Sequence, residues 1–358
     1  MSDHVETPTP AERNHLRLGS WIDRVPPGYW VLGVILLVIP AFVSDFVMFQ
    51  IMGWTFILGL IALSLMFLGG YGGMVSLAQM AFAGFAGYMV AIFGNSAITT
   101  ISQDWPWWIV IPLALLLTVL FATAVGWLAV RTEGIYTIMI TLAIAAAFFY
   151  FTRQNYDLFN GFQGFNSVLP PQIFGVDWRG PEAFYYLTLF WAVLGYCAVL
   201  YVSRAPFGLA LQGVRDNPRR MAALGYNVTA HRVAAYSFAA VIAGIGGILL
   251  TWQSSQISPG TVGINAAIDI LVIAVVGGLR HPIGPFIGAF IYVLLKTFAT
   301  DVLVALGLSG DRFQLVIGLG FLIIVFFSPD GILGLWEKLR TSQNRDPLTG
   351  QDRPRGPL

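Results

Sequence analysis

The residues with the clearest chemical purpose form a short basic segment, RDNPRRMAALG at 215–225, which lies between two long apolar stretches. Asn217 is a favoured N-cap, Pro218 suits the first helical position, and Gly225 can take the left-handed conformation that ends a helix. The segment is therefore predicted to form a helix of about two turns. Its side chains suit recognition of a partner or of lipid headgroups.

The two arginines of this helix support the same interpretation. Arg219 and Arg220 would occupy the first turn, where the positive end of the helix dipole disfavours cations. Intrinsic helix stability therefore does not explain why arginines occupy these two positions, and we expect them to contact a partner. Met221 and Leu224 are three residues apart on one helical face, a spacing that fits a groove on a soluble protein.

A second group of polar residues lies inside apolar stretches, where a charged side chain costs about 2.5 to 3.5 kcal/mol on insertion scales. Gln79 lies in a glycine-flanked stretch that, if broken, offers backbone N–H groups to a substrate carboxylate. A hydrogen bond from Gln79 to a neighbouring helix explains it equally well. Asp269 fits a substrate ammonium or, more simply, a helix N-terminus. We place Gln79, Thr141 and Asp269 on a candidate substrate pathway.

Several kinds of functional site have no counterpart in the sequence. No Gly-x-x-x-x-Gly-Lys-Ser/Thr loop occurs, so ATP binding through a P-loop is excluded. The four histidines have no metal-ligand spacing, and no Gly-x-Ser-x-Gly elbow is present. Cys197 is the single cysteine, which excludes an intramolecular disulfide. We therefore predict no catalytic residue, no metal site and no cofactor bound by this chain, and expect that it is not an enzyme.

The composition indicates the class of protein. Hydrophobic residues make up 57% of the chain and charged residues only 10%, against roughly a quarter charged in a soluble domain. We predict an all-α, polytopic helical bundle in a membrane. Spans need about 17 to 25 residues. Ten stretches qualify, and eight or nine also fit because several are broken by glycine: 29–48, 51–69, 74–94, 106–130, 135–152, 184–203, 232–252, 265–280, 283–300 and 311–328.

The basic residues predict the orientation, because short cytoplasmic loops carry an excess of Lys and Arg. Ten spans with both termini in the cytoplasm leave few of the 19 basic residues outside, namely Arg153, Arg179, Lys296 and Arg312. We expect a cytoplasmic segment at 1–28, a transmembrane domain at 29–330 and a partly disordered cytoplasmic tail at 331–358. Residues 1–28 lack the apolar core of a signal peptide.

Two loops within the transmembrane domain are predicted to face opposite sides. The loop 204–231, with the basic segment, would be cytoplasmic. The loop 153–183 would be the longest outer segment, and its Gly, Pro and aromatic content indicates an ordered cap. Together with loop 253–264 it supplies the largest hydrophilic area outside. The polar side chains expected to set the register of a docked protein there are Asn155, Asp157 and Gln163.

Seven blocks of sequence, in order, resemble the permease subunits of bacterial ABC importers for branched-chain amino acids, most closely the M-type permease. A single block would be a weak glycine-rich pattern, and the order of all seven makes the resemblance specific. The blocks are GGYGGMVSLAQMAFAGFAGY (69–88), RTEGIYTIMITLA (131–143), NGFQG (160–164), SRAPFGLALQGVRDNPRRMAALG (203–225), AGIGG (243–247), VVGGLRHPIGPFIGA (275–289) and SPDGILG (328–334).

The resemblance implies a multi-pass permease of the bacterial inner membrane. It would assemble with a second homologous permease, two ATP-hydrolysing ATPases and an extracytoplasmic solute-binding protein, and would pass branched-chain amino acids. The loop 204–231 becomes the coupling loop, so the residues expected to serve the ATPases are Arg215, Asn217, Pro218, Arg219, Arg220, Met221, Leu224 and Gly225. No contact with nucleic acid is expected.

Alternatives remain at this stage. The same family imports urea, short amides and aromatic acids, so the cargo transfers poorly from the resemblance. An ion-coupled secondary transporter would need charged residues near the midplane, for which Asp269 is nearly the only candidate. An intramembrane enzyme would need catalytic groups that the spans lack.

Overall fold

The computed structural model describes residues 27–172, 175, 177–305 and 318 of the 358. Their regular structure is helical apart from two short strands, which confirms the predicted all-α class. The α-helices are α3 (Pro27–Val38), α4 (Trp54–Met66), α5 (Gln79–Phe93), α6 (Trp107–Ala129), α7 (Ile135–Gln154), α8 (Tyr156–Phe159), α9 (Pro181–Arg204), α10 (Pro206–Asp216), α11 (Pro218–Ala223), α12 (Val228–Ser254), α13 (Ile264–Gly277) and α14 (Gly284–Ala305).

Shorter elements join these helices. Wide π-type turns η3 (Val47–Gly53) and η4 (Phe67–Tyr71) extend α4 at both ends. The 3₁₀ turns are η2 (Ile39–Ala41), η5 (Gly161–Gln163) and η6 (Pro259–Val262). The strands β1 (Phe165–Asn166) and β2 (Gln256–Ile257) form one antiparallel pair.

Among the residues that the structure describes, five helical stretches are long and apolar enough to cross a membrane, which supports a multi-pass membrane protein. They are Val47–Tyr71, Trp107–Ala129, Ile135–Gln154, Pro181–Arg204 and Val228–Ser254. Each contains or closely matches one predicted span. Three shorter apolar helices, Gln79–Phe93, Ile264–Gly277 and Gly284–Phe298, coincide with parts of three others.

Two predicted spans need correction. The stretch 29–48 is not one helix, because α3 ends at Val38 and a turn at η2 precedes the next helical stretch. Pro40 lies at the start of that turn, where its missing N–H and its ring oppose continuation of an α-helix. The stretch 74–94 becomes helical only at Gln79. The stretch 311–328 lies outside the described residues except for position 318.

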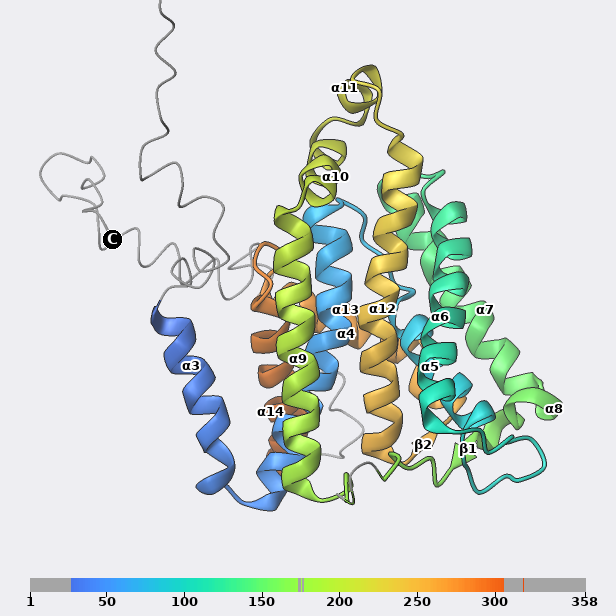
Figure 1. Cartoon of the computed structure of the whole chain (residues 1–358), viewed down its shortest axis with the longest axis vertical. Helices are drawn as coiled ribbons and strands as arrows, with labels where there is room; N and C mark the ends of the chain where they lie inside the picture. The colour runs from blue at the N-terminus through green and yellow to red at the C-terminus, as the bar shows by residue number, and fades with distance from the viewer. Residues whose placement is uncertain (1–26, 173–174, 176, 306–317, 319–358) are drawn as a thin grey trace, which may run out of the picture.

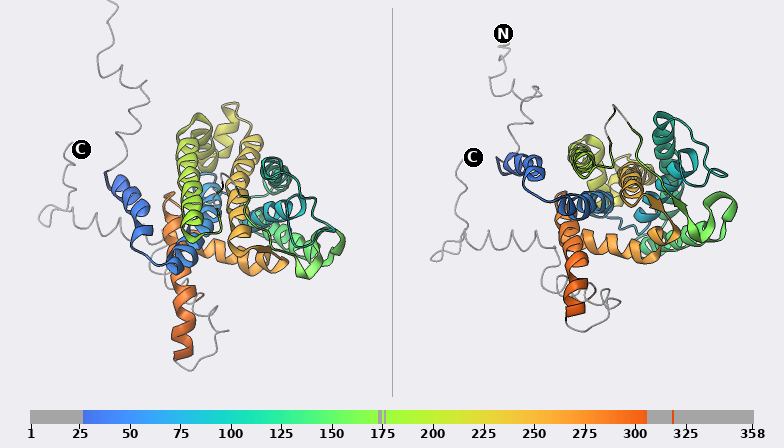
Figure 2. Two further views of the ribbon diagram at one scale, coloured as in Figure 1. Left: turned by 60° about the horizontal axis from the view of Figure 1, so that its bottom comes forward. Right: turned by 90° about the horizontal axis from the view of Figure 1, so that it is seen from below.

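The helix α12 lies at the centre of the bundle, packed against α4, α5 and α6. Figure 1 shows α9 and α4 on one side of it and α6 and α7 on the other. Close approach depends on small residues: a Cβ on Gly247 of α12 would overlap the backbone carbonyl of Ala83 in α5. Figure 2 shows α14, which packs against α4 and α13, projecting beyond the other helices.

The predicted cytoplasmic and outer loops lie at opposite ends of the bundle. The helices α10 and α11 form one end, whereas α8 and the β1–β2 pair lie at the other (Figure 1). Placement of the two loops on opposite sides of a membrane requires this arrangement.

Candidate functional site

The segment between α9 and α12, residues 205–227, contains two helices where the sequence predicted one. The helix α10 begins with Pro206 directly after α9 and buries Gly208, Ala210, Leu211 and Val214 against the bundle. Those buried positions have helical spacing, and a proline at the first helical position is a starting signal. These signals were available in the sequence and were missed because the basic residues that follow dominate the segment.

The second helix, α11, has the predicted caps. The Asn217 side chain accepts a hydrogen bond from the backbone N–H of Arg220 at 2.9 Å, and Pro218 is the first helical residue. The helix ends at Ala223, and Gly225 has the left-handed backbone with φ of +90°. The predicted helix is therefore confirmed, because each cap acts on residues close to it in the chain.

The tip of α11 presents its charges to solvent. Arg219 and Arg220 are exposed, and neither side chain makes a hydrogen bond or ion pair within the described part of the chain. Leu224 is 68% exposed. Met221 is half-buried, and a Cβ added to Gly213 of α10 would lie 2.8 Å from its sulfur. Of the predicted apolar pair, Leu224 alone is thus open to a partner.

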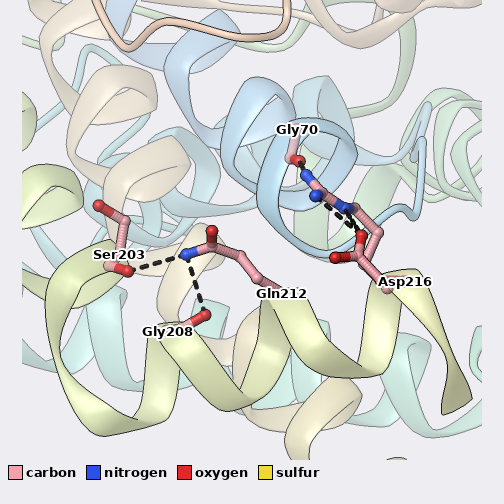
Figure 3. Close-up of polar contacts among 6 residues, drawn as sticks. Gly70, Ser203, Gly208, Gln212 and Asp216 are labelled. Atoms are coloured by element: carbon pink, nitrogen blue, oxygen red, sulfur yellow. Dashed lines mark hydrogen bonds and ion pairs between the residues drawn. The ribbon is translucent and has the colours of Figure 1, made fainter.

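Arg215, at the end of α10, is engaged within the chain. One terminal nitrogen, Nη1, donates to the backbone carbonyl of Gly70 in η4 at 2.5 Å. Nε and Nη2 both approach Oδ1 of Asp216 at 2.9 Å. The aliphatic stem packs on Gly73, where a Cβ would lie 2.5 Å from Cγ of Arg215. Figure 3 shows the contacts with Gly70 and Asp216.

The start of α10 is held by a different residue. Nε2 of Gln212 donates to the carbonyl of Ser203 in α9 at 2.9 Å and to that of Gly208 at 3.2 Å (Figure 3). One end of α10 is therefore attached to α9 and the other to η4. A movement of α10 would be transmitted to both.

The segment 72–78, which follows η4, is not helical. The buried hydroxyls of Thr141 and Ser76 accept hydrogen bonds from its backbone. Thr141 of α7 accepts a hydrogen bond from the backbone N–H of Leu77 at 3.1 Å. Ser76 accepts one from the N–H of Ala78 at 3.3 Å. The helix α5 thus begins inside the bundle, and its N-cap residue Ala78 makes no side-chain capping bond.

Gln79 is the first residue of α5 and is 1% exposed. Its Oε1 accepts a hydrogen bond from Ser64 of α4 at 2.8 Å, which is the contact between helices considered as the simpler explanation. Its Nε2 has no partner within the described residues, and the hydroxyl of buried Tyr236 from α12 lies close to Ser76. Gln79 and Thr141 thus meet around one broken segment. Ser64, Ser76 and Tyr236 were missed because serine and tyrosine hydroxyls are common in apolar stretches of sequence.

Asp269 belongs to a different group. Its carboxylate lies close to the Tyr292 hydroxyl of α14 and near the charge of Lys296. Nζ of Lys296 lies 5.9 Å from the centre of the Trp54 ring. The contacts of Asp269 are therefore with α14 and not with Gln79 or Thr141.

The predicted docking residues lie on an ordered cap. Asn155 caps α8 by accepting the backbone N–H of Leu158 at 3.0 Å. Asp157 and Gln163 are exposed. Pairing of β1 with β2 joins the loop 153–183 to the loop 253–264, with Phe165 opposite Ile257. The two loops that were expected to lie side by side form one structure.

Comparison with known proteins identifies relatives. Residues 47–325 match the family described as "Branched-chain amino acid transport system / permease component". The chain is 32% identical over 158 residues to "Probable branched-chain amino acid transport permease protein LivH" of Methanocaldococcus jannaschii, which covers 41% of this chain and 47% of that protein.

Two further relatives are longer matches. The "High-affinity branched-chain amino acid transport system permease protein LivM" of Salmonella typhimurium is 21% identical, over 75% of this chain and 68% of that protein. The protein of the same name from Escherichia coli is 20% identical, over 72% of this chain and 65% of that protein. The matches thus span 47% to 68% of the lengths of these three relatives. No solved structure matches the chain.

Proposed function

Because this chain belongs to the family of permease components of branched-chain amino acid transport systems, we propose that it is one of two permease subunits of an ABC importer. With a second homologous permease it would form the translocation pathway in the inner membrane. Two ATPases would supply the energy, so this chain needs no cofactor and performs no catalysis. An extracytoplasmic binding protein would deliver branched-chain amino acids.

The observation that carries this proposal is the exposed tip of α11. Arg219 stands in the first turn of a capped helix, where a cation gains nothing from the helix dipole, and Arg220 follows it in a helix of only six residues. Neither has a partner within the described residues, and Leu224 beside them is exposed. Two free guanidinium groups and an apolar side chain suit an acidic or polar groove on an ATPase.

The opposite end of the bundle suits the binding protein. The cap formed by β1, β2 and α8 is ordered, and it exposes Asp157 and Gln163. A rigid polar surface can fix the register of a partner without strong affinity. A binding protein that docks, delivers its ligand and dissociates needs such a surface. Asn155 contributes by capping α8.

The neutral character of the interior supports a small amphiphile as cargo. A zwitterion that leaves water needs fixed donors and acceptors, because transfer of a bare charge costs many kcal/mol. Gln79 and Thr141 offer neutral groups beside the uncapped start of α5. We include Asp269 in the pathway proposal as an ammonium contact that becomes available once α14 moves. The nearness of Tyr292 and Lys296 to its carboxylate disfavours an ion-coupled mechanism.

Uptake of labelled leucine by cells that express the complete transporter tests the proposal. We expect unlabelled leucine to compete, and urea and acetamide to have no effect. Uptake that is blocked by urea but not by leucine would show that the substrate is an amide and not an amino acid. The assignment of the chain as a permease would still stand. Uptake that persists when both ATPases carry inactivating changes would contradict the ABC mechanism.

A further inference from the structure

A second feature of the chain is an open pocket at the end of α7, with a single positive charge. The pocket measures about 540 Å³ and is lined by Arg153 and Gln154 of α7, Tyr156 of α8 and Phe162 of η5. Figure 1 shows α7 and α8 at the edge of the bundle. None of the four residues is among those assigned above to coupling, to the substrate pathway or to docking.

The guanidinium group of Arg153 lies over two aromatic rings. Its Cζ is 6.0 Å from the centre of the Phe149 ring, one turn earlier in α7, and 5.7 Å from the centre of the Phe162 ring. Both distances are within the range of cation–π attraction. Arg153 is exposed, and its guanidinium makes no hydrogen bond or ion pair within the described part of the chain. The rings therefore hold the cation in place while its N–H donors stay available.

The turn that supplies the other rings is fixed by the fold. Gly161 has a left-handed backbone with φ of +56°, and a Cβ at this position would overlap the ring of Tyr156. The N–H of Gly161 donates to the carbonyl of Asn155 at 3.1 Å. Phe159, between them, is 2% exposed and belongs to the hydrophobic core. Tyr156 and Phe162 are exposed, yet the backbone that carries them is attached to the bundle.

The surroundings of the pocket are those of a membrane interface. The helix α7 is the least buried of the five candidate spans. A short turn joins it to α6, so the end of α7 and the start of α6 lie at the same end of the bundle. Trp107 and Trp108 at the start of α6 and Tyr150 near the end of α7 are all exposed. Aromatic rings gather where hydrocarbon meets headgroups, so Arg153 lies at the depth of the lipid phosphates.

We propose that this pocket binds the headgroup phosphate of an anionic phospholipid, of which phosphatidylglycerol is the simplest example. The guanidinium of Arg153 donates to two phosphate oxygens, a geometry that arginine matches and lysine does not. The amide of Gln154 and the hydroxyl of Tyr156 are the further donors at the rim. The ring of Phe162 lies against the glycerol and the first methylene groups. A lipid needs an open site, because its acyl chains stay in the bilayer.

The charges of the pocket select among phosphate compounds. One guanidinium with neutral donors suits a phosphate diester, which carries one negative charge. A zwitterionic lipid adds an ammonium group where the pocket already has a cation, and no carboxylate lines the pocket to receive it. Asp157, the next acidic residue along the chain, is outside the lining and makes no ion pair with Arg153 in the described structure. Inorganic phosphate has no apolar part to contact Phe162.

Native mass spectrometry tests the proposal on the full-length chain, purified in detergent with the subunits that accompany it and stripped of lipid. Titration with dioctanoyl-phosphatidylglycerol should show saturable binding that weakens about tenfold or more in Arg153→Gln, because the charged hydrogen bonds are lost. The matched control is Arg179→Gln, which removes a basic residue of the same loop that does not line the pocket. It should bind as the wild type does.

A comparison of ligands on the wild type tests the chemistry without any substitution. Dioctanoyl-phosphatidylcholine should bind about tenfold or more weakly than the phosphatidylglycerol, and inorganic phosphate should not displace the latter. Equal binding of the two lipids would overturn the preference for an anion. Displacement by inorganic phosphate would show a site for free phosphate and overturn the lipid assignment.

Three further results would refute the pocket itself. They are unchanged binding in Arg153→Gln, an equal loss in Arg179→Gln, and the absence of saturable phosphatidylglycerol binding from the assembled complex, as expected if a partner subunit covers the pocket. Monodisperse elution of each variant establishes that a loss of binding is not a loss of folding. The inference goes beyond the proposed function, since none of these measurements depends on which substrate is transported.

Discussion

Replacement of Arg215 by alanine should uncouple ATP hydrolysis from transport without separating the subunits. The side chain joins the end of α10 to η4 through its bond to Gly70. From η4 the chain continues into the pinned segment 72–78 and then to Gln79. A movement imposed on α10 and α11 by an ATPase would reach the interior by this direct connection.

The magnitude follows from the contacts. A hydrogen bond to a charged group contributes about 1.5 to 3 kcal/mol when removed. The ion pair between Arg215 and Asp216 has side chains 38% and 66% exposed, and an exposed pair contributes about 0 to 1 kcal/mol. We therefore expect Arg215→Ala to destabilise the attachment of α10 to η4 by about 2 kcal/mol. This corresponds to an equilibrium constant for the attachment that is about 30-fold lower.

The assay is leucine transported per ATP hydrolysed in proteoliposomes that contain the complete importer. We expect Arg215→Ala to lower this ratio about tenfold or more. Arg215→Lys should be intermediate, because an ammonium group lacks the fork that reaches Gly70 and Asp216 together. The matched control Asp216→Asn removes the exposed ion pair and leaves the bond to Gly70, so its ratio should stay near the wild-type value.

Two results would refute this reasoning. Equal ratios for Arg215→Ala and Asp216→Asn would show that the bond to Gly70 transmits nothing. Loss of the ATPases from the purified Arg215→Ala complex would instead show that Arg215 contacts an ATPase directly, as expected from the sequence.

Three other predictions concern the two ends and the packing of the bundle. Changing Arg219 and Arg220 together to glutamate should abolish transport and substrate-stimulated ATP hydrolysis while membrane insertion persists; normal coupling would contradict the proposed ATPase contact. A photo-cross-linker on Asp157→Cys should capture the binding protein during transport, and failure to do so would remove α8 from the docking surface. Gly247→Val should lower the free energy of unfolding by about 1 to 3 kcal/mol or more through overlap with a backbone carbonyl, measured by thermal unfolding in detergent, whereas Gly33→Val, which meets open space, should not.

Local features of the fold could be predicted because they depend on neighbours in the chain. The caps of α11 act over three residues, from Asn217 to the N–H of Arg220, and such contacts can be recognised in any sequence. The apolar stretches behave in the same way, because length and hydrophobicity alone determine whether a helix can cross a bilayer. The excess of basic residues adds the expected orientation.

The candidate sites required contacts that no local pattern contains. Arg215 and Gly70 are 145 residues apart, and Leu77 and Thr141 are 64 apart. Both arginine and threonine were identified as functional residues, but their partners are backbone groups, which every residue carries. Their pairing depends on which helix ends meet, and a sequence read alone does not contain that information.

The sequence by itself determined that this chain is a multi-pass helical membrane protein and that residues 218–223 form a capped basic helix. Composition, helix caps and apolar length act through the solvent and through adjacent residues, so they need no knowledge of the final fold. Only the tertiary structure decided that Arg215 is bound to the backbone of Gly70 and that Leu77 is bound to Thr141. Those features arise where side chains from distant segments pack together, because packing selects among many arrangements that satisfy the same local preferences.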